Sequence, residues 1–74
     1  MSDVSIIGAR VRAERRLRRL SQTALGEAAG LSLPTIFRLE HGMVAPTLET
    51  IAAVARALGL TVSELIDSDG EEAA

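Results

Sequence analysis

Apolar residues recur along this chain with the spacing of helices, and the stretches that contain them begin in a common way. A Ser or Thr stands before each stretch, with one apolar residue directly before it and another four positions after it. The side chain of this Ser or Thr caps the unpaired N–H groups of a first helical turn. The complete pattern occurs at Ser21, Ser32 and Thr61, and Thr47 marks a fourth start. We expect a further helix to begin near Ser5.

Three glycines mark the corresponding ends. Gly30, Gly42 and Gly59 fall where a helix terminus takes a left-handed residue. No segment alternates apolar and polar residues as a strand does. The sequence therefore predicts an all-α fold, one compact domain over residues 5–67, with helices at residues 5–18, 22–29, 33–41, 48–58 and 62–67. Residues 68–74 are acidic and lack apolar anchors, which is typical of a disordered tail.

The segment from Gln22 to His41 has the pattern of a helix-turn-helix. Gly26 lies one turn before the bend at Gly30. The predicted helix at residues 33–41 crosses the one at residues 22–29 closely at Gly26, which leaves room only for a small residue. Apolar residues of both helices can then face one core. Ile36 and Leu39, on the helix at residues 33–41, are directed inward.

The sequence resembles the phage repressor and Cro type of helix-turn-helix domain, also called Xre-like, over roughly residues 6–67. The pieces that carry the resemblance are IGARVRAER, LSQTALGEAAGLS, TIFRLEHG, PTLETIAAVARALG and TVSELI. The resemblance implies a compact five-helix, repressor-like DNA-binding domain. In this family the third helix docks in the major groove of double-stranded DNA, and the protein is usually a two-fold dimer.

The resemblance also assigns roles to individual residues. It implies that Gln22 binds a phosphate and steadies the third helix, and Thr23 beside it is a further candidate for a DNA contact. Arg15 and Glu40 match a pair that ties the first helix to the end of the third. We expect a buried clamp, which is costly to break on one side, and a surface pair of little energy is the alternative.

The outward stripe of the third helix follows from helix geometry once Ile36 and Leu39 face inward. It comprises Leu33, Pro34, Phe37, Arg38 and His41. Arg38 is the best candidate to read a base, because a guanidinium can hold guanine O6 and N7 together. Ser32 and Thr35 can bind phosphates at the start of the helix, where N–H groups favour anions.

Some of these residues differ from the family's pattern and leave alternatives open. Leu33, Pro34 and Phe37 stand where relatives carry polar residues; this apolar patch can contact thymine methyl groups, fold against neighbouring Met43 and Val44, or bind a protein, and the first two uses are favoured. Pro34 is tolerated because it falls in the first turn.

Three other positions carry open questions of the same kind. His41 can reach a phosphate or cap the end of its helix. Glu14 occupies a commonly apolar position, and Arg19 stands where relatives often have a capping glycine. We therefore expect the first helix to end differently from theirs.

The charge of the chain is divided unevenly. The net charge is −2, but residues 1–45 hold seven Arg against four acidic residues, and residues 46–74 hold one Arg against six. Affinity for DNA comes largely from cations that displace phosphate counterions. The division favours a basic face toward nucleic acid, and an ordinary solvated helix surface is the alternative.

Several classes of protein are excluded by composition. One His, no Cys, no glycine-rich phosphate loop and no metal-ligand cluster argue against an enzyme, a cofactor or a metal. A single aromatic residue argues against a stacking surface for single strands. The sequence has no apolar run long enough to span a bilayer and no signal-peptide pattern. We therefore expect a soluble cytoplasmic protein without a membrane partner. A membrane-bound first helix is disfavoured, because Ile7, Val11 and, at its end, Leu17 are needed by the core.

We therefore expect a sequence-specific transcriptional regulator, a repressor or controller protein that binds a near-palindromic operator as a homodimer. Candidates for the dimer contact are Leu60, Val62 and Ile66, although burial in the core explains them as well. The alternative is an antitoxin or similar module, whose fold and apolar third-helix patch hold a toxin or another regulator.

Overall fold

The computed structural model describes residues 3–66, and five α-helices account for most of them. The helices are α1 (Asp3–Leu17), α2 (Gln22–Ala29), α3 (Leu33–Glu40), α4 (Leu48–Ala57) and α5 (Val62–Ile66). The predicted all-α, five-helix fold is confirmed, and each predicted helix end lies within two residues of the observed one. The predicted acidic tail at residues 68–74 lies outside the described residues. Across residues 3–66, every helix is too short or too polar to cross a bilayer.

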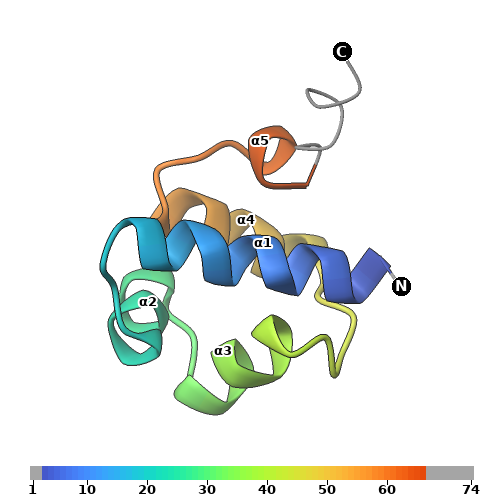
Figure 1. Cartoon of the computed structure of the whole chain (residues 1–74), viewed down its shortest axis with the longest axis horizontal. Coiled ribbons are helices and arrows are strands. Elements are labelled where there is room, and N and C mark those ends of the chain that lie inside the picture. The colour runs from blue at the N-terminus through green and yellow to red at the C-terminus, as the bar shows by residue number, and fades with distance from the viewer. Residues whose placement is uncertain (1–2, 67–74) are drawn as a thin grey trace.

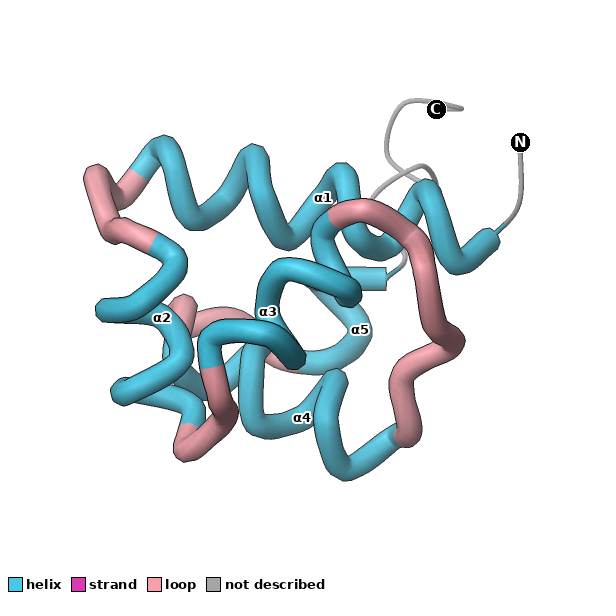
Figure 2. Tube along the Cα trace, turned by 90° about the horizontal axis from the view of Figure 1, so that it is seen from below, coloured by secondary structure: helices cyan, strands magenta, loops and turns pink. Residues whose placement is uncertain are grey.

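The helices are arranged so that α3 lies at the surface. α1 and α4 run along opposite sides of the molecule (Figure 2). The α2–α3 pair connects them on one face, where α3 contacts α1 and α2 contacts α4, and α5 contacts both on the other face (Figure 1). Seen from the first of these faces, α3 lies nearest to the viewer (Figure 2). The rest of the domain therefore supports α3 from behind.

The core draws at least one residue from every helix or the turn that follows it. Its buried members are Val11, Leu25, Ile36, Leu39, Val54, Ala55, Leu58 and Leu65. The predicted inward direction of Ile36 and Leu39 is thereby confirmed. The placement of Leu17 in the core is wrong, because its side chain is 75% exposed. Six residues beyond Val11, at about 100° per residue, Leu17 points roughly 120° away from the buried side of α1.

The predicted helix starts are confirmed by their hydrogen bonds. In each case a side-chain oxygen accepts from the backbone N–H three residues on: Ser21 from Ala24, Ser32 from Thr35, Thr47 from Thr50 and Thr61 from Glu64. Glu64 also accepts from the N–H of Thr61 at 2.8 Å, which closes the cap in both directions. These local bonds set the first residues of α2 to α5.

The glycines at three helix ends take the left-handed backbone conformation, as predicted, with φ between 67° and 75° at Gly30, Gly42 and Gly59. Arg19 takes the same conformation, with φ of 57°. The expectation that α1 ends differently is therefore wrong. The N–H of Leu20 donates to the carbonyl of Arg15 at 3.1 Å, the bond that closes a glycine-type helix end.

Candidate nucleic-acid interface

The turn between α2 and α3 depends on the absence of a side chain at Gly26. A Cβ added there would lie 2.7 Å from the carbonyl oxygen of Leu31 and 3.5 Å from Cγ1 of Ile36. The predicted need for a small residue is confirmed, and the nearest obstacle is the backbone of the turn. The N–H of Leu31 donates to the carbonyl of Gly26 at 2.8 Å, which fixes the angle between the two helices.

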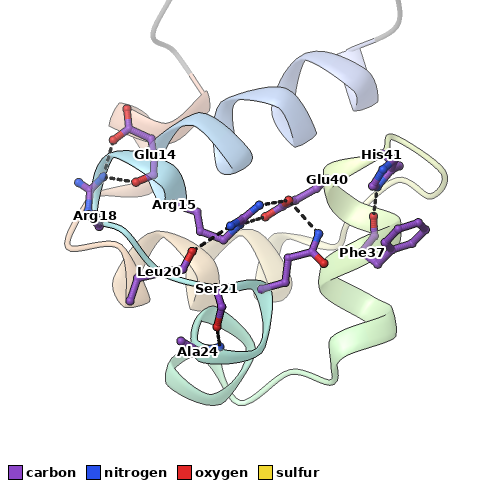
Figure 3. A network of polar contacts seen from close by, with 10 residues as sticks. Glu14, Arg15, Arg18, Leu20, Ser21, Ala24, Phe37, Glu40 and His41 are labelled. Atoms are coloured by element: carbon purple, nitrogen blue, oxygen red, sulfur yellow. Dashed lines mark hydrogen bonds and ion pairs between the residues drawn. The ribbon is translucent and has the colours of Figure 1, made fainter.

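A buried ion pair holds the end of α3 against α1 (Figure 3). Arg15 donates through Nε to one carboxylate oxygen of Glu40 at 2.6 Å and through Nη2 to the other at 3.0 Å. The Glu40 side chain is fully buried, and that of Arg15 is 12% exposed. Nη1 of Arg15 donates to the carbonyl of Leu20 at 2.9 Å. The predicted buried clamp is confirmed, and it also fixes the turn after α1.

The surroundings of Glu40 keep its carboxylate charged. Burial by itself would raise the pKa of Glu40, but hydrogen bonds from Arg15 and Gln22 and the charges of Arg15 and Arg12 outweigh it, and the pKa lies below its ordinary value. The hydrogen bond with Glu40 in turn raises the pKa of Arg15 against the opposing effect of burial. The pair is therefore fully ionised at neutral pH.

Gln22, the first residue of α2, joins the same network. Its Nε2 donates to Oε1 of Glu40 at 3.1 Å, so the start of α2 is tied to the end of α3. An amide nitrogen carries two hydrogens, so this contact leaves one for a further acceptor. The clamp therefore comprises Arg15, Gln22 and Glu40, and it connects three helices.

Gly8 is a further positioning residue that the sequence did not single out. A Cβ added to Gly8 would overlap the carbonyl oxygen of Leu39 and lie 3.0 Å from that of Glu40. The backbones of α1 and α3 therefore touch directly. A glycine within a helix costs stability relative to alanine, and this cost is a signal of a close approach at Gly8, although it does not identify the partner segment.

The outward face of α3 carries the predicted candidates for base contacts. Leu33, Pro34, Phe37 and Arg38 are all exposed on it. Leu33 and Phe37 are 47% and 45% exposed, and Met43 and Val44 after the helix are 62% and 46% exposed. The apolar patch is therefore not folded away against Met43 and Val44.

His41 caps α3 and supports Phe37. Its Nδ1 donates to the carbonyl oxygen of Phe37 at 2.8 Å, and the two rings stack with centroids 4.0 Å apart. Of the two alternatives for His41, the helix cap is the one observed. Figure 3 shows the Phe37 ring directed away from the clamp.

The predicted phosphate contacts lie at the starts of α2 and α3. Thr23 and Ser32 are exposed and Thr35 is half-buried. The hydroxyls of Ser32 and Thr35 hydrogen-bond to each other at 2.8 Å. The start of α2 lies beside the end of α3, where Gln22 contacts Glu40, whereas Ser32 and Thr35 stand at the start of α3.

The charges of α1 are partly neutralised within the helix. Glu14 lies 3.1 Å from Nε of Arg10 and 2.6 Å from Nη1 of Arg18, one turn before and one turn after it. This pairing explains a carboxylate at a position where the family resemblance led us to expect an apolar residue. The predicted basic half of the chain thus exposes less positive charge than its arginine count indicates.

The fold and this surface define a class of protein, the all-helical domains built around a helix-turn-helix. The family model described as Helix-turn-helix matches residues 11–65. The chain is 41% identical over 66 residues to the immunity repressor protein of Bacillus phage phi105, across 89% of this chain and 44% of that protein. The chain belongs to the phage repressor and Cro-type (Xre-like) helix-turn-helix family, which consists of DNA-binding transcriptional regulators and not of enzymes. It spans less than half the length of the phage phi105 repressor.

Two solved structures are similar over most of the chain. The restriction-modification controller protein C.AhdI from Aeromonas hydrophila is 31% identical with a TM-score of 0.84, across 88% of this chain and 98% of that one. The P22 c2 repressor, solved in complex with a synthetic operator, is 32% identical with a TM-score of 0.77, across 85% and 96% of the two chains. The resemblance stated from sequence motifs is thus confirmed.

Proposed function

We propose that this protein is a sequence-specific regulator of transcription, a repressor or controller, that reads a near-palindromic operator in double-stranded DNA with α3. The observation that carries the proposal is the buried clamp of Arg15, Gln22 and Glu40, which fixes α3 from behind while Arg38 stands exposed on its outward face. The P22 c2 repressor, solved with a synthetic operator, supports the proposal through its similar fold.

Each candidate residue has a distinct part in this proposal. Arg38 holds guanine O6 and N7 in the major groove. Gln22 donates its second amide hydrogen to a phosphate, and Thr23, Ser32 and Thr35 are phosphate contacts near the helix starts, where free N–H groups favour anions. These contacts set the position of α3 on the duplex, and the base contacts supply specificity.

The remaining candidates on α3 have narrower roles. His41 has its Nδ1 bound to the carbonyl of Phe37. Its Nε2 donates to a phosphate only in the protonated form. Leu33, Pro34 and Phe37 face the same groove as Arg38.

A homodimer would present two copies of α3 to successive major grooves, with half-sites about 34 Å apart. Leu60 and Val62 pack against the core, whereas Ile66 at the end of α5 is 46% exposed and Leu48 at the start of α4 is 70% exposed. Ile66 and Leu48 are therefore the residues we assign to the dimer contact. Sedimentation of the DNA complex tests this assembly, and one protomer per operator would contradict it.

The experiment that tests the function is selection of bound sequences from random duplex DNA, with binding followed against salt. We expect a near-palindromic motif with half-sites one helical turn apart, and an affinity that falls as salt rises. Recovery of no motif, with only weak salt-dependent adhesion, would contradict specific regulation. Such a regulator acts in the cytoplasm, where its DNA is.

The second candidate function is a protein-binding role, in an antitoxin or a partner of another regulator. The exposed apolar residues after and within α3 favour it, since exposed apolar patches often mark protein interfaces. A toxin or regulator that copurifies with the protein would support this role. Selection of a DNA motif would favour the first.

A further inference from the structure

The outward face of α3 is poor in hydrogen-bonding groups. Of its residues Leu33, Pro34, Phe37 and Arg38, only Arg38 has a polar side chain. The other residues of α3 are the half-buried Thr35 and the buried Ile36, Leu39 and Glu40. A helix that reads bases through hydrogen bonds needs several donors or acceptors on this side, and α3 offers one guanidinium.

Neighbouring polar groups are engaged within the protein. The hydroxyl of Ser32 is bound to that of Thr35 at 2.8 Å and accepts from its N–H at 3.3 Å. Nδ1 of His41 is bound to the carbonyl of Phe37. The hydroxyl pair keeps one hydrogen for a phosphate, and the chemistry that α3 offers to the bases themselves is one cation beside an apolar surface.

That apolar surface has a defined shape. Leu33 and Phe37 are four residues apart, so their side chains lie one above the other on the same side of the helix. The rise of a helix over four residues is about 6 Å, close to two base-pair steps of about 3.4 Å each. Phe37 is held by its stack on His41, which lies at a centroid distance of 4.0 Å. The strip is therefore long enough for Leu33 and Phe37 to face bases that lie two steps apart.

We propose that α3 recognises the 5-methyl groups of thymines, which contact Leu33 and Phe37 beside the guanine held by Arg38. This inference rests on the proposed function and specifies the base pairs that it reads. The thymine methyl is the apolar group that a major groove presents among its donors and acceptors. An apolar side chain distinguishes base pairs there through that methyl, so this surface selects pyrimidines by their 5-position.

Recognition of the methyl alone has a consequence for modified DNA. An apolar side chain forms no hydrogen bond with O4 of thymine or N4 of cytosine, and 5-methylcytosine carries its methyl at the same ring position as thymine. The contact with Leu33 or Phe37 is therefore retained when 5-methylcytosine replaces thymine. Binding at such a position depends on whether the cytosine is methylated.

The test compares four duplexes that carry the selected operator and differ at one thymine position in each half-site. The position holds a thymine–adenine, uracil–adenine, 5-methylcytosine–guanine or cytosine–guanine pair. Fluorescence anisotropy measures the dissociation constant of each for the wild-type protein. Removal of the methyl is expected to weaken binding about fourfold per half-site, since burial of one such group is worth about that factor. The same loss is expected from thymine to uracil opposite adenine and from 5-methylcytosine to cytosine opposite guanine.

Variants of the protein assign the effect to its side chains. Leu33→Ala or Phe37→Ala is expected to abolish the methyl effect at the position that the residue contacts. Arg38→Ala, on the same face, is the matched control, and it should weaken binding yet keep the methyl effect. Leu33 and Phe37 are about half exposed, so both variants should fold, which circular dichroism verifies.

The outcomes separate this inference from the function on which it rests. Equal affinity for the thymine and uracil duplexes would overturn methyl recognition and leave sequence-specific binding intact. A selected motif that contains no thymine, and at which a 5-methyl group has no effect on affinity, would do the same. Recovery of no motif would contradict both. A methyl effect that survives both Leu33→Ala and Phe37→Ala would also overturn the assignment to this surface.

Discussion

Single residues in this domain carry identifiable conformational and electrostatic costs. Arg19 has a φ of 57°, in the left-handed region, although it has a Cβ. The left-handed conformation costs a residue with a side chain roughly 1–2 kcal/mol. The carboxylate of Glu40 is fully buried, and its charge is retained through the contacts with Arg15 and Gln22. Both costs predict measurable effects of substitution.

Replacement of Arg19 by glycine should stabilise the protein. Glycine adopts the left-handed conformation without strain, and after its own entropic cost we expect Arg19→Gly to raise the free energy of unfolding by about 0.5–1 kcal/mol. Urea denaturation measures the change. Arg16→Gly is the matched control, because Arg16 lies within α1 and should lose about 1 kcal/mol. A loss of stability in both variants would contradict the role of the φ angle.

Acid should remove the contribution of Glu40. At neutral pH, Glu40→Gln is expected to lower the free energy of unfolding by about 3 kcal/mol, because it leaves Arg15 without its partner. The pKa of Glu40 is lower in the folded state than in the unfolded state. The stabilisation is therefore complete above the unfolded pKa of about 4.3, and it is lost as the pH falls through the folded pKa.

The measurement is urea denaturation of wild type and Glu40→Gln from pH 7 to pH 3. The stability difference between them should shrink on acidification. Glu27→Gln, at an exposed position of α2, controls for the removal of one carboxylate and should show only a small difference at every pH. A gap between wild type and Glu40→Gln that stays constant, or widens in acid, would show that the charge of Glu40 does not stabilise the fold.

At the scale of helices, features that depend on residues near each other in the chain were predicted from the sequence, and contacts between distant segments were not. The starts of α2 to α5 were predictable because each cap joins residues three positions apart, as Ser32 and Thr35 do. The inward residues of α3 followed from helix periodicity. The direct contact of Gly8 with Leu39 was not predicted, since no pattern in one sequence joins residues 31 positions apart. The clamp was found only through resemblance to a family, for the same reason.

Substitution of Gly8 tests how α1 and α3 are packed. In an unobstructed helix, glycine to alanine would add about 1 kcal/mol of stability. Because the new Cβ would overlap the carbonyl oxygen of Leu39, we expect Gly8→Ala instead to lower the free energy of unfolding by about 2 kcal/mol. Thermal and urea denaturation provide the measurement.

The control for this change is the neighbouring position. Ala9 is exposed on α1, so Ala9→Gly should cost about 1 kcal/mol through helix propensity alone. The sign of the Gly8→Ala effect is decisive, because a gain in stability would mean that α1 and α3 do not touch there. We also expect Gly8→Ala to weaken DNA binding by shifting α3.

For the whole molecule, the arrangement of charge and apolar surface defines one face. The sequence predicted a basic half, and the structure shows that Arg10, Arg15 and Arg18 within it are paired with Glu14 or Glu40. Overall charge is therefore a weaker argument for the proposed DNA-binding surface than the exposed position of Arg38 on α3. The helices that support α3 leave its outward face clear (Figure 2). This division between a fixed inner side and an exposed outer side is the basis of the proposed function.

The most direct test of base recognition by α3 measures the affinity of wild type and Arg38→Ala for every single-base variant of the selected operator. Loss of a two-point guanine contact is expected to weaken binding by about 1–3 kcal/mol per half-site. The variant should become indifferent to the base at one symmetric pair of positions, with the salt dependence of binding unchanged. Equal loss on every sequence, with a shallower salt dependence, would make Arg38 a phosphate contact and contradict recognition of bases by this residue of α3.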